Sequence, residues 1–572
     1  MVEIRTSPEG TGLEAMSPSL TVAEIEAVLR ESGVGRTKRK GKRVGFSFRD
    51  AAPLAIDPSY DIELSASARA AIENRLRIAG NSAAVIEQFH ELRAAPAEKA
   101  RRLLIDSKIA NDLLDDHQLK NVAVMAIPNG WGACVFDEQG TGKTLTVVAA
   151  FDLLAARNLT DVLVVIAPKS MVAEWAVEFQ KFTGEVYTVA VAEGSRREKA
   201  RALSSGADVV VINYEGAVAI ADDLQLLAKK TRVTLVVDES FNVKNPDARR
   251  TAVLSEIREF CDRCFVLCGT PAPNSPLDLV AQFNLADLGL TFDGVQLPED
   301  EDRLRTAIRT AMDERGIYTR NLKQVVLPDL PVKEFTRVAV EMPPVQEAMY
   351  NAARGELVDD LTAATEDEFQ ANYMSFLERR NALLRICSNP SAIDPSYDEV
   401  PGKLAVLDEL IPRYIDGGEK IVLWSYYRAS LDALADRYRH FGLVRIDGSV
   451  PDVGERREAV RRFQEDDDTR LFLGNPAAAG AGLTLHSARI AIYESMSNQA
   501  AHFMQSLDRI HRRGQARDVE YVMLLCDGSI EEVEYQRLLD KTDAQADVLG
   551  DPVPIRPTRD LLLRELLGNT RS

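Results

Sequence analysis

The sequence is short of cysteine and of aromatic residues, and it has no long apolar run. Six cysteines among 572 residues are too few for a disulfide framework, which indicates a reducing compartment. No run of about 18 apolar residues occurs, so a membrane-spanning helix is not expected. The start of the chain, MVEIRTSPEG, lacks the basic and apolar pattern of a signal peptide. Membrane insertion and classical secretion are therefore disfavoured, and a cytoplasmic location is expected.

Positive charge is also in deficit. Lysine and arginine number 69 against 88 aspartate and glutamate, which gives a formal net charge of −19. This balance argues against a nucleic-acid partner, because binding phosphate requires local positive charge. One segment departs from it, since RTKRKGKR (36–43) has six cationic residues in eight. This basic segment fits a solvated arm, and it also fits an auxiliary phosphate contact.

The cysteines form one suggestive cluster, Cys261, Cys264 and Cys268. A zinc site would need a fourth ligand, but no second cysteine or histidine pair follows nearby. The segment FVLCG around Cys268 has the pattern of a buried strand. We therefore expect structural cysteines here and not a zinc site.

The composition is that of a globular protein, with 45% hydrophobic and 27% charged residues. At roughly 150 residues per domain, the length predicts three or four domains. Apolar residues recur at helical spacing from about 65 to 114, whereas from Val122 short apolar runs alternate with amphipathic stretches. That alternation is typical of parallel sheets with crossover helices. The predicted strands are 161–168, 208–213, 233–239 and 265–269, then, after a helical and charged region from about 297 to 395, 420–426, 469–475, 489–495 and 519–525.

The strongest chemical signal is FDEQGTGKT (136–144), which lies between an apolar strand pattern and an apolar helix pattern. Gly140 and Gly142 would let backbone N–H groups face phosphate oxygens at a helix N-terminus. Lys143 would contact the β and γ phosphates, and the Thr144 hydroxyl would hold Mg²⁺. The pattern predicts a nucleotide site, although Asp137 stands where the strict motif has its first glycine.

Two further segments narrow the chemistry. Asp238 and Glu239 end the apolar run VTLVVDE, where an aspartate can hold Mg²⁺ and a glutamate can accept a proton from the attacking water. Far along the chain, QSLDRIHRRGQ (505–515) carries Arg509 and Arg512. On a helical segment these two arginines would share a face and could reach one phosphate. Each segment alone fits a solvated strand end or a basic helix end, but together with the phosphate loop they indicate an ATPase.

These segments resemble, in content and order, the motifs of superfamily-two helicases, and within them the Swi/Snf-type double-stranded DNA translocases. The matching segments run from about 115 to 532, about three-quarters of the chain. They include DEQGTGKT, whose acidic residue at Asp137 is the family's own variant, and DESFNVKN, where the family usually has Asp-Glu-Ala-His. Phe241 thus stands in place of a histidine that links the ATP site to neighbouring motifs.

The resemblance implies an α/β fold: two RecA-like lobes with parallel sheets, a helical insert between them, a small helical N-terminal prefix and a helical C-terminal tail. The expected parts are a mostly helical prefix with the basic segment (1–112), the first lobe (113–296), the insert (297–398), the second lobe (399–530) and a C-terminal brace (531–572). It also suggests a single-chain motor of bacterial or phage type, acting as a monomer.

The resemblance further implies roles for individual residues. The expected cofactors are ATP and Mg²⁺, with Thr144 and Asp238 on the metal, and Lys143, Asp238, Glu239, Arg509 and Arg512 in catalysis. Gln118 is expected to read the adenine. The nucleotide would also be held by Gln139, Gly140, Thr141, Gly142, Lys143, Thr144 and Gly482. DNA contacts are expected from Lys169, Asn213, Arg456 and Thr484, and coupling of ATP state to lobe movement from Gly269, Thr270 and Gln505.

The expected function is an ATP-dependent translocase or remodeller that tracks the backbone of duplex or forked DNA. A protein partner could dock on the prefix, the insert or the tail. Three alternatives remain: an RNA-directed helicase, a nucleotide-gated scaffold with weak ATPase activity, and a small-molecule kinase. The Swi/Snf-like insert argues against the first, the full catalytic set against the second and the distant arginine pair against the third.

Overall fold

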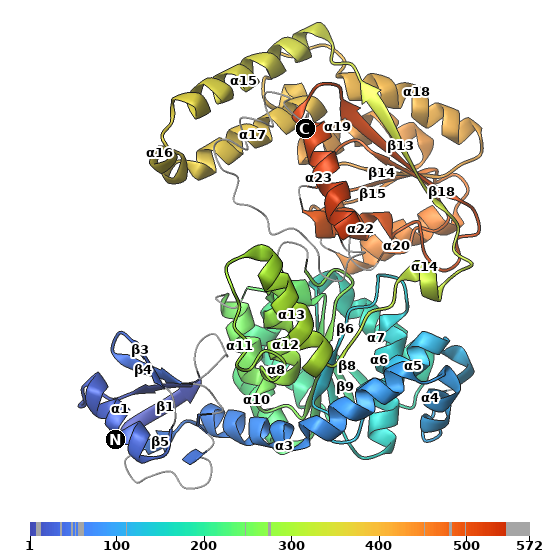
Figure 1. Ribbon diagram of the computed structural model, residues 1–572. Coiled ribbons are helices and arrows are strands. Elements are labelled where there is room, and N and C mark those ends of the chain that lie inside the picture. Colours follow the sequence, from blue (N-terminus) through green and yellow to red (C-terminus); the bar gives the residue numbers. More distant parts are fainter. Residues whose placement is uncertain are drawn as a thin grey trace. The chain divides into compact units, whose positions relative to one another are not determined.

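The computed structural model describes residues 1–6, 13–34, 37–46, 50–51, 53–54, 62–109, 111–245, 248–272, 276–450, 452–479, 483–497 and 499–544. The chain forms two compact units, unit 1 (Met1–Val326) and unit 2 (Leu327–Ser572). Each unit contains a parallel sheet covered by helices (Figure 1). Among the described residues, no helix is long and apolar enough to cross a membrane.

The sheet of unit 1 has seven parallel strands in the order β12-β6-β11-β10-β7-β9-β8. Four of them confirm predicted strands, because continuous Val, Ile and Leu runs suit strands that are buried on both faces. The strands are β6 (Gly132–Val135), β7 (Val162–Ala167), β8 (Val189–Ala192), β9 (Val209–Asn213), β10 (Val233–Asp238), β11 (Arg263–Leu267) and β12 (Tyr318–Thr319).

Helices cover this sheet and share its core. Phe151, Trp175 and Phe179 of these helices are buried with strand residues such as Val165 and Phe265. The helices are α5 (Asp116–Met125), α6 (Lys143–Ala156), α7 (Val172–Thr183), α8 (Arg196–Leu203), α9 (Tyr214–Ala219), α10 (Ala221–Lys230), α11 (Arg249–Arg258), α12 (Leu277–Asp287), α13 (Glu301–Arg315) and α14 (Lys323–Val326). The first lobe therefore has the α/β architecture expected for it.

The prefix differs from the prediction in its first part. Residues 2–64 contain a five-stranded sheet, β3-β4-β2-β1-β5, whose inner face packs on α1 (Val22–Glu31). Its strands are β1 (Val2–Thr6), β2 (Leu13–Met16), β3 (Thr37–Lys40), β4 (Arg43–Phe46) and β5 (Ile62–Leu64). Strands of three to five residues give too short an alternation to be recognised from the sequence.

The basic segment, apart from Arg36, which lies outside the described residues, forms the β3–β4 hairpin at the edge of this small sheet. The second part of the prefix is helical as expected, with α3 (Ala66–Ala94) and α4 (Ala97–Leu103). Asn74 and Arg75 of α3 contact Glu259 of the first lobe. The prefix is therefore a sheet followed by helices that are anchored on the lobe.

The sheet of unit 2 has six parallel strands in the order β13-β18-β17-β14-β16-β15. Alternate residues of β14 face two different cores: Ile421 and Leu423 face one, Val422 and Trp424 the other. This is the two-residue period of a strand buried on both faces. The strands are β13 (Lys333–Val340), β14 (Ile421–Trp424), β15 (Leu443–Ile446), β16 (Leu471–Gly474), β17 (Ile490–Tyr493) and β18 (Val519–Cys526). Four of them confirm the second series of predicted strands.

The predicted insert (297–398) does not form one helical body. Its first part belongs to unit 1, where α13 packs and Tyr318 of β12 pairs with Cys134 of β6. Its next part, β13, pairs with β18 in the sheet of unit 2. The helical protrusion is therefore shorter than predicted and consists of α15 (Pro344–Ala363), α16 (Glu366–Ala371) and α17 (Tyr373–Ser388). Through these helices the chain leaves the sheet of unit 2 and returns to it (Figure 1).

The remaining helices of unit 2 flank its sheet. They are α18 (Gly402–Asp416), α19 (Arg428–Tyr438), α20 (Val453–Glu465), α21 (Pro476–Ala479), α22 (Ala500–Leu507) and α23 (Ile530–Ala544). Helix α23 forms the described part of the expected C-terminal brace, and residues 545–572 lie outside the described residues.

Candidate functional site

The predicted motifs of unit 1 gather at one edge of its sheet. The phosphate loop follows β6, the acidic pair ends β10, and Gly269 and Thr270 follow β11. Lys169 follows β7 and Asn213 ends β9. Because all these strands are parallel, their carboxyl ends lie along the same edge, which is where open α/β sheets bind ligands.

The phosphate loop has the backbone that its glycines predict. Gly140 and Gly142 have φ of 86° and 87°, in the left-handed region. A Cβ on Gly142 would also lie 2.1 Å from the Gln118 side-chain nitrogen, so any other residue would be strained and would displace Gln118. Gln118 donates to the carbonyl oxygens of Thr141 (3.1 Å) and Gly142 (3.4 Å). The residue expected to read adenine therefore also holds the loop.

Lys143 begins helix α6, where backbone N–H groups and the helix dipole favour an anion. Its ammonium donates to the carbonyl oxygens of Asp137 (2.8 Å) and Glu138 (3.1 Å) across the loop. The loop thus holds this cation at the start of α6, and its contact with phosphates stays a prediction.

Asp137, in the position of the missing first glycine, has a structural task. It is buried, and its carboxylate accepts hydrogen bonds from Asn121 (2.6 Å), from the Thr319 hydroxyl (3.0 Å) and from Asn321 (3.0 and 3.1 Å). These donors lie on α5, at the end of β12 and just beyond it, so the carboxylate ties the loop to segments about 16 and 180 residues away. A glycine there would leave those donors unpaired.

Asp238 is buried at the end of β10 and is held by two donors. The Trp175 indole donates to Oδ2 at 2.8 Å, and the Glu239 backbone N–H donates to Oδ1 at 2.9 Å. Burial raises the pKa of Asp238, while the Trp175 bond and the charge of Lys143 act in the opposite direction. Each carboxylate oxygen keeps a further lone pair, and the Asp238 carboxylate and the Thr144 hydroxyl are oxygen donors of the kind that would suit Mg²⁺ with its waters.

Glu239 has an unusual backbone conformation for a glutamate, with φ 50° and ψ 54°. A strained left-handed residue of this kind persists only where its surroundings hold it. Here Asn242 donates to its carbonyl oxygen from both the backbone and the side chain, and Gln139 of the phosphate loop donates to its carboxylate. Gln139 therefore orients the expected proton acceptor.

The expected DNA contacts of unit 1 differ in their surroundings. Lys169 is exposed after β7. Asn213 caps α9, since its Oδ1 accepts from the Gly216 N–H at 3.0 Å.

The expected coupling residues of unit 1 lie close to the phosphate loop. Thr270 is buried, and a Cβ on Gly269 would lie 2.9 Å from Gln139 Cγ. The Gly-Thr-Pro segment thus packs directly against the phosphate loop.

In unit 2 the arginine pair converges, but not on a helix. Helix α22 ends at Leu507, so Arg509 and Arg512 lie in the turns that follow it, which corrects the predicted helical face. Both arginines donate to the Leu483 carbonyl oxygen, at 3.2 and 3.1 Å. Arg512 also donates to the Thr484 hydroxyl at 2.7 Å. The turn therefore brings together three of the predicted residues.

Two other predicted residues of unit 2, the coupling residue Gln505 and the DNA-contact residue Arg456, form hydrogen bonds within the unit. Gln505 is buried, and its carbonyl oxygen accepts from Arg509 at 2.9 Å. Arg456 donates to the carbonyl oxygens of Val450 (2.7 Å) and Asp447 (3.0 Å), and burial lowers its pKa. Gly482 lies outside the described residues.

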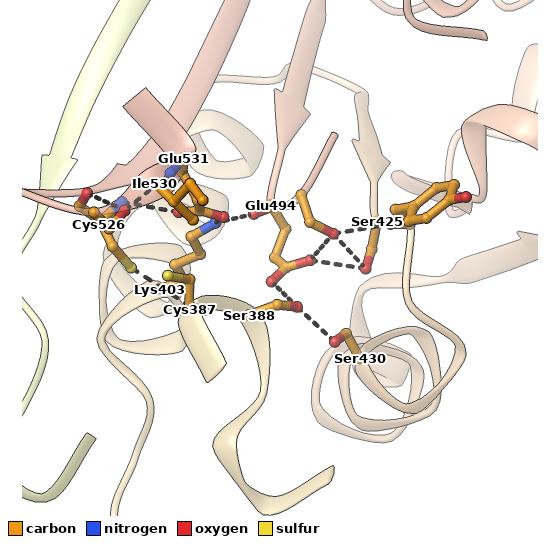
Figure 2. Close-up of polar contacts among 12 residues, drawn as sticks. Cys387, Ser388, Lys403, Ser425, Ser430, Glu494, Cys526, Ile530 and Glu531 are labelled. Carbon is orange, nitrogen blue, oxygen red and sulfur yellow. Dashed lines mark hydrogen bonds and ion pairs between the residues drawn. The ribbon is translucent and has the colours of Figure 1, made fainter. Parts of the chain in front are cut away.

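A buried polar network occupies the carboxyl edge of the second sheet (Figure 2). The Lys403 ammonium donates to Glu531 Oε1 (2.6 Å) and to the Glu494 carbonyl oxygen (2.5 Å). The Glu494 carboxylate accepts from Ser388 (2.6 Å) and Ser425 (2.8 Å). The network ties α17, α18 and α23 to the ends of β14 and β17, so it connects the protrusion and the brace to the lobe.

The clustered cysteines of unit 1 are buried. Cys264 lies in β11, Cys268 follows it, and the Cys261 thiol donates to the Ile257 carbonyl oxygen. Burial raises the pKa of Cys264 and of Cys268 to about 12, so both remain thiols at neutral pH. Zinc binds the thiolate form, and these thiols therefore suit a structural role better.

Four residues outside the predicted site contact its motifs from other elements: Trp175, Tyr214, Gln282 and Arg320. The Tyr214 hydroxyl, for example, donates to the Asp238 carbonyl oxygen at 2.5 Å. Trp175 lies in APKSMVAEWAVEFQKF (167–182), a segment that resembles a family motif, whereas nothing in the sequence marks the other three. Their contacts depend on the order of strands in the sheet.

A phosphate loop, an acidic strand end and paired arginines on two parallel-sheet units define a two-lobed ATPase with RecA-like lobes. The SNF2-related domain family model matches residues 117–392 and the helicase conserved C-terminal domain model matches residues 402–514. The chain belongs to the SNF2-related, Swi/Snf-type ATPases of helicase superfamily two.

Similar proteins include the transcription regulatory protein SNF2 of Saccharomyces cerevisiae, which is 26% identical over 81% of this chain and 29% of that protein. The ISWI chromatin-remodeling complex ATPase ISW1 of the same yeast is 26% identical over 75% of this chain and 40% of that protein. This chain therefore spans well under half the length of these relatives. The solved Sulfolobus solfataricus SWI2/SNF2 ATPase core domain is 24% identical over 81% of this chain and 96% of that chain, with a TM-score of 0.37.

Proposed function

We propose that the protein hydrolyses ATP and uses the energy to move along duplex DNA, following the backbone without reading sequence. The observation that carries the proposal is the convergence of Lys143, Asp238 and Glu239 at one sheet edge, with Gln139 holding the Glu239 carboxylate. A passive scaffold has no need of a glutamate oriented in this way, and the distant arginine pair argues against a small-molecule kinase.

In the proposed reaction, the phosphate loop and the start of α6 bind the β and γ phosphates, and Lys143 neutralises their charge. The Glu239 carboxylate accepts a proton from the water that attacks the γ-phosphorus. When bound by Thr144 and Asp238, Mg²⁺ would supply further charge neutralisation of the phosphates. Asp238 is held for this task by Trp175, and Glu239 by Gln139.

Arg509 and Arg512 complete the proposed active site. Their guanidinium groups would stabilise the charge that develops on the transferred phosphoryl group, which requires the two units to close on ATP. Closure would then depend on the γ-phosphate, and hydrolysis would release it. Since both arginines bond Leu483 and Arg512 bonds Thr484, a shift of the arginines would also move a predicted DNA-contact segment.

Contacts to DNA would come from Lys169, Asn213, Arg456 and Thr484, with the β3–β4 hairpin as an auxiliary phosphate contact. Such contacts position a protein on the backbone and carry no sequence information. Among similar proteins, one structure is titled as a SWI2/SNF2 ATPase core in complex with dsDNA. That title names the partner we propose here: duplex DNA.

Steady-state ATPase assays with duplex DNA, single-stranded DNA, RNA and no nucleic acid test this function. We expect duplex DNA to stimulate turnover at least about tenfold and RNA to give little stimulation. Preferential stimulation by RNA would favour the RNA-directed helicase, and slow turnover under every condition would favour the nucleotide-gated scaffold.

A matched pair of variants tests the proposed DNA contact. Lys169→Ala should raise the DNA concentration needed for half-maximal stimulation several-fold, because it removes one phosphate contact. Lys230→Ala removes an equally exposed lysine at the end of α10, ahead of β10 and hence at the opposite edge of the sheet, and should change nothing. Equal effects of both substitutions would mean that Lys169 contributes only general charge.

A further inference from the structure

The segment after β10 lacks the usual link between the ATP site and the Gly-Thr-Pro segment. Phe241 stands where the family usually has histidine, and a phenyl ring offers no hydrogen-bonding nitrogen. Its neighbour Ser240, however, adds a hydroxyl where the family usually has alanine. This hydroxyl is fully buried, so it requires a partner inside the protein.

The partner is Gln282 on helix α12, which is also fully buried. The Ser240 hydroxyl donates to Gln282 Oε1 at 2.6 Å. The Gln282 side-chain nitrogen donates to the carbonyl oxygens of Pro271 (2.5 Å) and Asp278 (2.8 Å). One amide therefore joins the acidic strand end to the Gly-Thr-Pro segment.

We propose that Ser240 and Gln282 form the route by which the state of the ATP site reaches the Gly-Thr-Pro segment, replacing the histidine that Phe241 displaces. Both are positioning residues, since neither contacts the proposed nucleotide site directly. The role rests on the proposed function, because it deepens the coupling of ATP hydrolysis to movement.

The physical basis is the burial of the bridge. Both polar atoms of the Gln282 side chain are engaged: the oxygen accepts from Ser240, and the nitrogen donates to two carbonyl groups. A displacement of Ser240 would leave buried polar groups unpaired unless Gln282 and Pro271 followed. Movement of the turn that carries Glu239 is therefore transmitted to Pro271 and, through the chain, to Thr270.

Hydrogen–deuterium exchange of the full chain, read by mass spectrometry, tests this route without DNA. In the wild-type protein, a non-hydrolysable ATP analogue with Mg²⁺ should slow exchange in peptides covering 137–145, 238–242 and 265–272, by about threefold or more. In Gln282→Leu, we expect the first two segments to respond as before and the third to lose its response. An unchanged response of 265–272 in this variant would overturn the proposal.

Gln346→Leu is the matched control. Gln346 is an equally buried glutamine of unit 2, which donates to the Ile386 carbonyl oxygen (2.8 Å) and accepts from the Gly402 N–H (3.0 Å). Its loss should lower thermal stability as Gln282→Leu does, yet leave the response of 265–272 intact. If both variants lose that response, destabilisation and not coupling explains the result.

A second readout separates this role from packing. Ser240→Ala removes the same bond from the other side, so the double variant Ser240→Ala/Gln282→Leu should reduce the DNA-stimulated ATPase rate no further than Gln282→Leu alone. Additive losses would contradict a shared route.

If the wild-type phosphate-loop peptides show no response to nucleotide at all, the proposed function itself fails and the coupling role fails with it. If the phosphate-loop peptides respond to nucleotide, and 265–272 responds equally in the wild type and in Gln282→Leu, the coupling role alone is overturned.

Discussion

Glu239 concentrates the chemistry of the proposed reaction in one side chain. Its left-handed backbone and its bond from Gln139 hold the carboxylate beside the phosphate loop. Glu239→Gln keeps the shape of the side chain but removes the proton acceptor. We expect this variant to bind ATP with unchanged affinity and to turn over about a hundredfold more slowly or worse, as measured by nucleotide binding and steady-state hydrolysis.

The control for that change is Glu185→Gln, the same substitution at an exposed position between α7 and β8. It should leave turnover within about twofold of the wild-type rate. Turnover of Glu239→Gln close to that of the wild type would contradict the role assigned to the Glu239 carboxylate.

Among the elements, helix α23 is attached by a buried ion pair. Its Glu531 contacts the Lys403 ammonium of α18, and both side chains are almost fully buried. Burial alone would lower the pKa of Lys403, but the charge of Glu531 raises it above its ordinary value. Burial raises the pKa of Glu531, and the charge of Lys403 opposes that shift. The two ionised forms therefore depend on each other.

Lys403→Met should destabilise unit 2 strongly, because it leaves the Glu531 carboxylate buried without its cation. Loss of one partner of such a pair costs about 3–5 kcal/mol. We expect a lower midpoint of thermal unfolding by calorimetry, and a large recovery in Lys403→Met/Glu531→Leu, which removes both charges of the pair. Arg461→Met, which breaks an exposed pair with Glu458 on α20, should leave that midpoint unchanged. Failure of the double variant to recover would mean that lost packing, not an unpaired charge, causes the effect.

At the scale of the whole molecule, the net charge of −19 and the proposed DNA partner have to be reconciled. Net charge is an average over the chain, whereas phosphate contacts depend on local charge, such as that of exposed Lys169 or of the β3–β4 hairpin. The acidic remainder should limit non-specific binding. We therefore expect the apparent DNA affinity to fall about tenfold or more between roughly 50 and 200 mM salt.

This dependence is measured by titrating DNA into the ATPase assay at several salt concentrations. The hydrolysis rate at saturating DNA serves as the control. It should change far less with salt than the DNA affinity does, because it does not depend on how tightly the protein binds the DNA phosphates. An affinity that does not vary with salt would contradict binding through the phosphate backbone.

The sequence alone determined the parts of this protein that local patterns encode. Buried parallel strands are continuous apolar runs, so β7, β9, β10 and β14 were predicted, and a glycine loop between strand and helix identified the phosphate-binding segment. Only the tertiary structure decided which distant residues meet. Asp137 with Asn321, Asp238 with Trp175, and Ser240 with Gln282 are brought together by strand order, which no local pattern records. For the same reason the short strands of the prefix, and the division of the predicted insert between the two sheets through β12 and β13, emerged only in the folded chain.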